Sequence, residues 1–297
     1  MKVGIPRALL YHSYHPFINS FFTELGAEII LSPETNKQVL NLGVEHCIDE
    51  ACLPIKVFHG HVASIKDQCD IILLPRIMQL RKGEFICPKF CGLPEMVLNS
   101  IPSLCKAITE PIYSYSEKSF NTFVKNTGHL FTNNSLTIEK AYKSALNAQR
   151  SFKGVIKDEG YVLTVALMGH PYNVYDKFSN MDVVKKLNNL GIGIITEDNV
   201  DSASIDLQVS KLYKKPFWSF VRNSYGSSTY LAENNKINGI VYVSSFACGI
   251  DSVLTELIKN RLGDFPMLIL KIDEQTGEAG LDTRLEAFVD MLERRCS

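Results

Sequence analysis

Short hydrophobic runs of four to eight residues recur along the chain, and a stretch with helical periodicity follows most of them. The runs are rich in isoleucine, valine and leucine, which favour buried β-strands. The expected strands are Lys2–Ile5, Ala27–Leu31, Asp70–Leu74, Tyr161–Met168, Ile192–Thr196, Gly239–Val243 and Met267–Ile272. Apolar residues recur every three or four positions in the expected helices Pro16–Leu25, Met181–Leu190, Ser252–Asn260 and Thr283–Arg295. This alternation predicts an α/β fold with parallel sheets.

A polar stretch at residues 114–159 interrupts the alternation. It holds asparagine, threonine, glycine and charged clusters between weaker helical patterns, as expected near a domain boundary. A chain of 297 residues with 45% apolar residues can fill two cores. We therefore expect two α/β domains, residues 1–150 and residues 151–297.

The charge balance and the chain start narrow the functional classes. A net charge of −1 gives no basic footprint for nucleic acid. The start, Met-Lys-Val-Gly-Ile-Pro-Arg, has no signal-peptide pattern, and no apolar run approaches the roughly 18 to 20 residues of a membrane span. We expect a cytoplasmic protein that binds neither nucleic acid nor membrane.

Five of the eight cysteines stand beside proline or glycine, or close to them, where a strand or loop is about to enter a helix. They are Cys47, Cys52, Cys87, Cys91 and Cys248. A disulfide framework is not expected in a reducing compartment, and four thiolates are the usual ligands of a 4Fe–4S cluster. The pattern predicts iron–sulfur binding, with Cys52, Cys87, Cys91 and Cys248 as first ligands and Cys47 as a fifth candidate.

Other interpretations of the cysteines stay open. The five thiols would be unmetallated if they only fill the core. A structural zinc site also takes four thiolates, but its paired ligands are commonly two residues apart, whereas these pairs have spacers of four and three. For Cys69 and Cys105 we expect packing roles, and for Cys296 an exposed thiol.

Several polar residues follow the predicted strands, where ligands bind in open α/β sheets. His170 is the candidate proton donor or substrate ligand, because imidazole titrates near neutral pH. Tyr172 and Asn173 either orient a carbonyl or hydroxyl, or close a turn. Arg76 is either a cleft residue or a structurally paired arginine. Lys89 supplies positive charge beside the negatively charged cluster.

Nucleotide-binding motifs are missing from this sequence. No Gly-x-x-x-x-Gly-Lys-Ser/Thr and no Gly-x-Gly-x-x-Gly follows a predicted strand. We therefore expect any use of ATP to belong to a partner.

Six sequence segments resemble the activase-related relatives of the 2-hydroxyacyl-CoA dehydratases, a superfamily that includes benzoyl-CoA reductase subunits and double-cubane cluster proteins. These are Lys-Val-Gly-Ile-Pro-Arg-Ala-Leu at the start, Glu50–Pro54, Leu74–Arg76, Cys87–Gly92, Gly169–Asn173 and Asp273–Gly277. The resemblance covers nearly the whole chain. It implies two Rossmann-like parallel-sheet domains with an iron–sulfur cluster in the cleft between them.

The resemblance also implies partners and a reaction. An ATP-dependent activase with its own cluster would supply low-potential electrons, and the chain would reduce or dehydrate a small molecule, as an oxygen-sensitive homodimer or heterodimer. A double cubane (8Fe–9S) needs six thiolates, so Cys69 or Cys105 would have to join the five. The competing hypotheses are a non-catalytic electron-transfer or cluster-carrying subunit and a zinc-stabilised binding module.

Overall fold

The computed structural model describes residues 1–296 except 153 and 155. By its internal contacts the chain divides into two compact units, Met1–Lys153 and Gly154–Ser297. Each unit has a four-stranded, all-parallel sheet of the Rossmann-like kind, which confirms the predicted α/β fold class.

The N-terminal unit has a four-stranded sheet with the order β2-β1-β3-β5 and a separate two-stranded parallel sheet, β4-β6. Its strands are β1 (Lys2–Ile5), β2 (Glu28–Leu31), β3 (Ile71–Leu73), β4 (Arg76–Gln79), β5 (Lys106–Ile108) and β6 (Pro111–Tyr113). Its helices are α1 (Tyr11–Glu24), α2 (Lys37–Glu45), α3 (Leu53–Ile65), α4 (Pro88–Cys91), α5 (Leu93–Ser100), α6 (Glu117–Gly128) and α7 (Ser135–Ser151).

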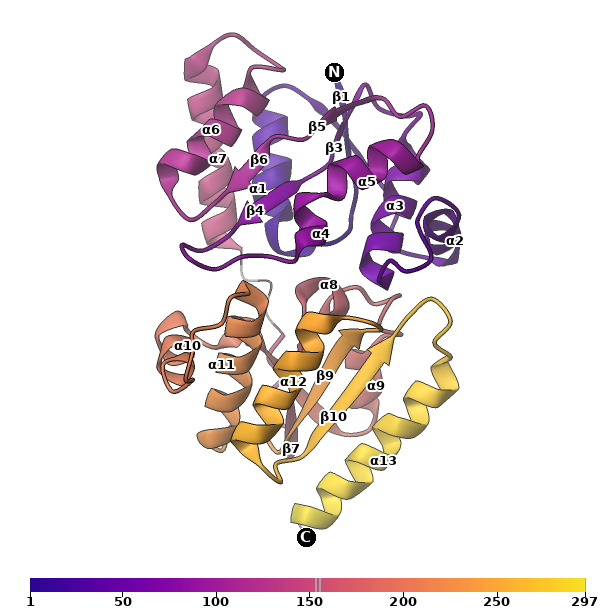
Figure 1. Cartoon of the computed structure of the whole chain (residues 1–297), viewed down its shortest axis with the longest axis vertical. Helices are drawn as coiled ribbons and strands as arrows, with labels where there is room; N and C mark the ends of the chain where they lie inside the picture. The colour runs from indigo at the N-terminus through magenta and orange to yellow at the C-terminus, as the bar shows by residue number, and fades with distance from the viewer. Residues whose placement is uncertain (153, 155, 297) are drawn as a thin grey trace. The chain divides into compact units, whose positions relative to one another are not determined.

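Helices cover both faces of this sheet. In Figure 1, α1, α6 and α7 lie together on one side, and α3 lies on the other with α2 packed outside it. The core on the first side is aromatic and includes Phe17, Phe21, Phe22, Phe123 and Tyr142. Burial of this apolar surface, at roughly 25 cal/mol per Å², is the main force that holds the layers together.

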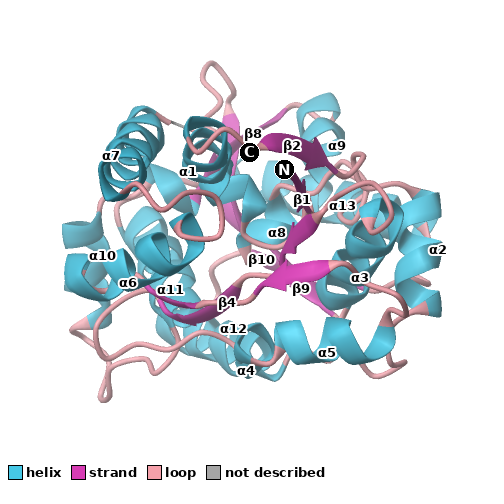
Figure 2. Ribbon diagram, turned by 90° about the horizontal axis from the view of Figure 1, so that it is seen from above, coloured by secondary structure: helices cyan, strands magenta, loops and turns pink. Residues whose placement is uncertain are grey.

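The C-terminal unit has the sheet order β10-β9-β7-β8. Its strands are β7 (Leu163–Gly169), β8 (Ile192–Thr196), β9 (Gly239–Ser245) and β10 (Met267–Ile272). Its helices are α8 (Pro171–Val174), α9 (Val183–Asn189), the 3₁₀ turn η1 (Glu197–Asn199), α10 (Ser202–Val209), α11 (Ser219–Glu233), α12 (Gly249–Leu262) and α13 (Glu278–Cys296). Helices α10, α11 and α12 cover one face, and α9 and α13 cover the other (Figures 1 and 2).

The polar stretch at residues 114–159 is more ordered than the sequence suggested. It contains α6 and α7, which are capped by the side chains of Ser116 and Asn134. Their polar residues face outward, while Phe123, Ala141 and Tyr142 enter the core. The strands β4, β5 and β6 were also missed, because runs of three or four residues carry too little hydrophobic pattern.

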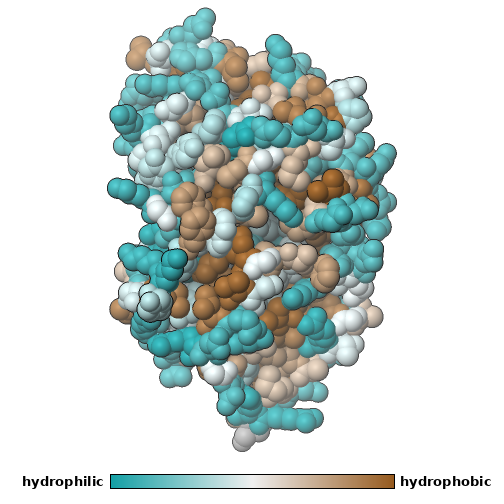
Figure 3. Space-filling model, in the orientation of Figure 1, coloured by the Kyte–Doolittle hydropathy of each residue, from teal (hydrophilic) through white to brown (hydrophobic). Residues whose placement is uncertain are grey.

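Among the described residues, no helix is long and apolar enough to cross a membrane. On the face drawn in Figure 3, hydrophilic side chains are widely spread, with hydrophobic ones in smaller groups between them.

Candidate functional site

Each sheet has a topological switch point, where the connections of two neighbouring strands leave in opposite directions. In the N-terminal unit this point lies between β1 and β3, and in the C-terminal unit between β7 and β9. Ligands of open α/β sheets bind at such points, beyond the carboxyl ends of the strands. Each of these two edges is therefore a candidate ligand site.

Four cysteines of the N-terminal unit lie around the starts of two helices. Cys52 is the N-cap of α3 and Cys87 is the N-cap of α4, and each is followed by a proline in the first turn. Proline suits this position because its missing N–H would have no helical partner. Since α3 leads back to the amino end of β3, its start at Cys52 lies on the carboxyl side of the sheet.

One lysine joins the two cysteine segments. Lys89 Nζ lies 3.6 Å from Cys52 Sγ, although Lys89 itself belongs to the segment of Cys87 and Cys91. Burial raises the pKa of Cys87, and the neighbouring Cys52 and Cys91 add to this, while the backbone N–H and the charge of Lys89 oppose it.

Cys47 belongs to the same group. Burial raises its pKa and Cys52 adds to the rise, while the charges of Lys56 and Lys89 act against it. Four thiols and two lysines therefore influence one another electrostatically in one region. Without metal, Cys47 and Cys87 are protonated at neutral pH, so metal binding there would release protons.

Arg76, at the start of β4, holds one of these cysteines by its backbone. Its Nη1 donates to the carbonyl oxygen of Cys91 at 3.0 Å, and its Nε donates to that of Thr109 at 3.2 Å. The guanidinium also pairs with Glu95, with Nη1 2.9 Å from Oε2. These contacts give Arg76 a positioning role for Cys91, while direct contact with a substrate stays a prediction.

An apolar cavity of about 300 Å³ lies at the same edge, around the carboxyl ends of β1 and β3. Its lining includes Ile5, Leu9, Tyr14, Phe17, Leu73 and Phe120. The volume is at the lower end of the range for small-ligand pockets. It would suit an apolar group.

The switch point of the C-terminal unit is polar and closely packed. Gly169 ends β7 with a φ of +143°, and a Cβ there would lie 2.3 Å from the carbonyl oxygen of Val243. Only glycine allows this approach. The chain then turns into α8 and places His170, only 2% exposed, beside the end of β9.

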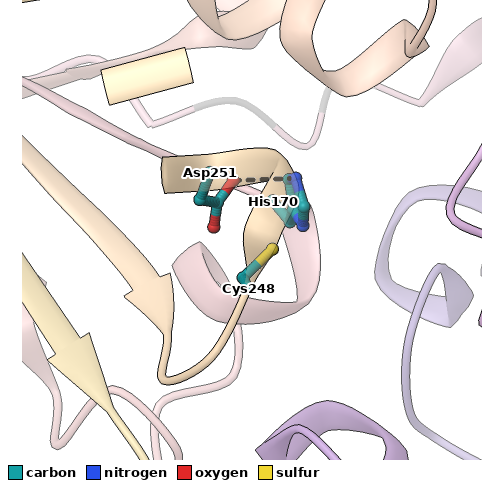
Figure 4. Close-up of side chains that lie close together, drawn as sticks. All are labelled: His170, Cys248 and Asp251. Atoms are coloured by element: carbon teal, nitrogen blue, oxygen red, sulfur yellow. Dashed lines mark ion pairs between the residues drawn. The ribbon is translucent and has the colours of Figure 1, made fainter. Parts of the chain in front are cut away.

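His170 belongs to a buried hydrogen-bonded network around Asp251. His170 Nε2 lies 3.1 Å from Asp251 Oδ1, as Figure 4 shows. Asp251 also accepts hydrogen bonds from Tyr242 and Ser244, each at 2.8 Å. Although burial raises the pKa of Asp251, the charge of His170 and these hydrogen bonds hold it below its usual value.

Cys248 points toward this network. The ligand atoms of His170, Cys248 and Asp251 all lie within 4.8 Å of one another, so the three side chains could hold a metal ion (Figure 4). Ala247, just before the cysteine, has a φ of +61°. Such a strained backbone in a non-glycine residue is typical of functional sites.

Tyr172 and Asn173 are both engaged with the protein. The hydroxyl of Tyr172 contacts His170 Nδ1, and its ring meets the His170 ring edge-on. Asn173 accepts a hydrogen bond from Ser245 Oγ at 3.0 Å and donates to the Val243 carbonyl at 3.4 Å. Asn173 therefore ties α8 to the end of β9, which closes the turn.

Three residues of this edge were not predicted from the sequence as site residues: Asp251, Tyr242 and Glu197. In the sequence, Asp251 resembles an ordinary acidic residue in the first turn of a helix, and Tyr242 resembles an ordinary strand residue. Glu197 follows β8 directly, and its position just after a strand is the sequence feature that could have identified it as a site residue. Burial and the neighbouring Asp198 raise the pKa of Glu197 to about 8.

The remaining cysteines lie elsewhere. Cys69 and Cys105 precede β3 and β5, so they lie at the amino ends of the strands, opposite to the four grouped thiols. Cys296 is exposed, as expected.

Comparison with protein families gives two matches. Residues 2–200 match the CoA enzyme activase uncharacterised domain (DUF2229). Residues 173–292 match the D-component of 2-hydroxyglutaryl-CoA dehydratase. Comparison with curated proteins gives no match. The two family matches confirm the resemblance to the activase-related dehydratase superfamily, and the chain belongs to the family of the CoA enzyme activase uncharacterised domain.

Proposed function

We propose that this chain is an iron–sulfur protein that accepts low-potential electrons from an ATP-dependent activase and reduces or dehydrates a small molecule at its cluster. The observation that carries the proposal is the grouping of four thiols around Lys89 in a member of this family. When bound, such a cluster takes up and releases single electrons. The activase would carry its own cluster, and the setting would be cytoplasmic.

The spacing of the thiols favours a cluster over a single zinc ion. Paired zinc ligands are commonly two residues apart, whereas Cys47 and Cys52 have a spacer of four residues and Cys87 and Cys91 a spacer of three.

The ligand set contains Cys52, Cys87 and Cys91, with either Cys248 or Cys47 as the fourth thiolate. Cys47 is favoured by its electrostatic link to Cys52 and Lys89. Cys248 is favoured by its strained loop at a switch point and by its place beside His170 and Asp251. The positive charges of Lys56 and Lys89 would stabilise the thiolates and the bound electron.

His170 and Tyr172 would supply the proton that accompanies the electrons. His170 is buried, whereas Tyr172 is partly exposed and its hydroxyl contacts His170 Nδ1. A proton would therefore reach a substrate by way of the Tyr172 hydroxyl, with Asp251 orienting the imidazole from its other nitrogen.

The burial of His170 also favours a second candidate function, a non-catalytic electron carrier. In that case the Tyr172–His170–Asp251 contacts would be structural. Tyr172→Phe separates the two candidates, because it removes only the hydroxyl. Loss of reductive turnover with full iron content supports the enzyme, and unchanged turnover supports the carrier.

The test of the cluster is the iron, zinc and acid-labile sulfide content of protein purified without oxygen. We expect about four irons with sulfide in the unaltered chain. Cys87→Ser and Cys91→Ser should each lose most of the iron, whereas the matched control Cys296→Ser should keep it. Unchanged iron in both variants, or zinc without sulfide, would overturn the proposal.

The same measurement identifies the fourth ligand. Iron loss in Cys47→Ser with full iron in Cys248→Ser would place the cluster within the N-terminal unit. The reverse result would make Cys248 the distant ligand. An EPR signal that appears when activase and ATP are added, and not with activase alone, would support the electron donor.

A further inference from the structure

Cys69 and Cys105 form a close pair of thiols far from the candidate cluster ligands in the fold. Their sulfur atoms lie 3.7 Å apart, although the residues are 36 positions apart in the sequence. Cys69 lies two residues before β3 and Cys105 one residue before β5, and these strands pair in parallel with Ile71 opposite Lys106. The sheet therefore brings the two segments that lead into the strands side by side.

The distance between the sulfur atoms suits a disulfide. They lie 3.7 Å apart and would have to approach by less than about 2 Å to reach the disulfide bond length of about 2.05 Å.

The surroundings hold the Cys69 sulfur in place. Cys69 Sγ lies 3.4 Å from the carbonyl oxygen of Ile65, and a Cβ at Gly4 would lie 2.6 Å from the same sulfur. Glycine at position 4 therefore leaves room for it. Burial and the adjacent Cys105 raise the pKa of Cys69 to about 12, so this thiol keeps its proton at neutral pH. Both residues are partly exposed, so a small reagent can reach them.

The pair is separate from the proposed cluster. Cys52 precedes the first residue of α3, and Cys69 lies beyond its last, Ile65. A helix of 13 residues is about 20 Å long. One cluster cannot bridge this distance, so Cys69 and Cys105 cannot complete the six thiolates of a double cubane.

We propose that Cys69 and Cys105 are a redox-active pair that forms a reversible disulfide by exchange with a low-molecular-weight disulfide. Cys105 attacks first as a thiolate, forming a mixed disulfide and releasing one reagent thiol. This removes the Cys105 thiol that helps to raise the pKa of Cys69, so Cys69 can lose its proton, displace the other reagent thiol and form the Cys69–Cys105 bond. The reagent is reduced to two thiols, which take up the two protons, and the protein loses two electrons.

The bond would close the segment that carries two cluster candidates. Residues 70–104 include β4, α4 and α5, with Cys87 and Cys91 among them. Closing a loop of this length restricts the unfolded chain and thereby stabilises the folded one. The disulfide would hold the two ends of this segment together whether or not metal is bound.

The first test is peptide mapping of the full chain. Protein is incubated with oxidised glutathione, blocked with N-ethylmaleimide, and cut with trypsin and a glutamate-specific protease. We expect a linked pair of peptides, residues 67–76 with residues 96–106, that dithiothreitol separates. Cys105→Ser should abolish the link, and Cys296→Ser should leave it unchanged. The proposal would be overturned if Cys296 takes up glutathione but no Cys69–Cys105 link forms. It would also be overturned if Cys69 or Cys105 forms links to other cysteines in equal amount.

The second test measures stability and depends on no activity. Oxidised chain should unfold at a higher urea concentration than reduced chain, and the difference should vanish in Cys105→Ser. An oxidised chain that unfolds earlier than the reduced one would show that the pair is not built for a disulfide. Iron content should be the same in Cys105→Ser as in the unaltered chain, which separates this pair from the proposed ligands.

Discussion

The two switch points of this molecule have the same strand topology but different side chains. Around β1 and β3, the N-terminal unit gathers four thiols, two lysines and an apolar cavity. Around β7 and β9, the C-terminal unit buries His170 and Asp251 in a network with Tyr242 and Ser244. The same strand arrangement therefore holds a group of thiols in one unit and a buried imidazole–carboxylate pair in the other.

The difference lies in how firmly each set of side chains is held. Asp251 is 1% exposed and has partners on both oxygens, so its removal would leave several buried groups unpaired. The thiols are partly exposed, and their contacts are the long, weak ones of sulfur, at 3.6 Å for Cys52 and 3.7 Å for Cys91. We infer that Asp251 at the C-terminal edge contributes more to folding stability than the thiols of the N-terminal edge do.

The largest effect is expected for Asp251→Ala. Loss of a buried, paired carboxylate typically costs about 3–5 kcal/mol. Urea unfolding followed by the fluorescence of Trp218, the single tryptophan, reports on the C-terminal unit. The exposed Asp290→Ala should change stability by less than about 0.5 kcal/mol. Circular dichroism, which follows both units, compares this cost with that of Cys52→Ala in metal-free protein. An equal cost would remove the contrast between the two edges.

Gly60→Ala should weaken the N-terminal unit. A Cβ at Gly60 would lie 1.9 Å from the carbonyl oxygen of Val39, where α2 and α3 approach each other. Overpacking of this kind costs about 1–3 kcal/mol. Since α3 carries Cys52 at its start, iron content should fall as well.

The matched control for this prediction is Gly280→Ala. It lies in α13 with nothing within 4 Å of the added Cβ, so it should stabilise the chain by up to about 1 kcal/mol. Circular dichroism during thermal unfolding measures both variants. Equal stability of the two would mean that α2 and α3 can separate without loss.

Acid should destabilise the N-terminal unit through His61. Burial, and then the charge of Arg7, lower the pKa of this imidazole from 6.5 to about 4, and its two nitrogens contact Ser32 and Thr35. The neutral form is favoured in the folded state, so the stabilisation is complete above pH 6.5 and is lost as the pH falls toward 4. Its size is about 3 kcal/mol.

Urea unfolding at several pH values between 7 and 4 measures this loss. His61→Gln should flatten the pH dependence of stability, and the exposed His129→Gln should leave it unchanged. A dependence that persists in full in His61→Gln would assign it to other groups.

The smallest effect is expected for Arg76→Lys. A lysine cannot hold the carbonyl of Cys91 and the carboxylate of Glu95 together as the guanidinium fork does. Iron should still bind, but a chelator should remove it a few-fold faster. Arg294→Lys, on the exposed side of α13, is the control and should not change this rate. Complete loss of iron from Arg76→Lys would instead point to direct contact with the cluster.

The sequence alone determined the layered α/β fold and the positions of most of its strands, because periods of two and 3.6 residues are local properties. It also placed the grouped cysteines at the entry to helices and His170 after a strand, since proline and glycine mark those turns. Short strands such as β5 and the largely polar helix α7 were not predicted from the sequence. Packing against neighbouring elements stabilises them, and their own hydrophobic pattern is weak.

Only the tertiary structure decided which side chains meet. It places Cys52 beside Lys89, Asp251 beside His170, and Cys69 beside Cys105. These contacts depend on strand order and register, which arise when sheets assemble from segments far apart in the chain. A carboxylate or thiol looks the same in sequence whether it is solvated or buried, and the fold alone sets its partners, its charge state and its chemistry.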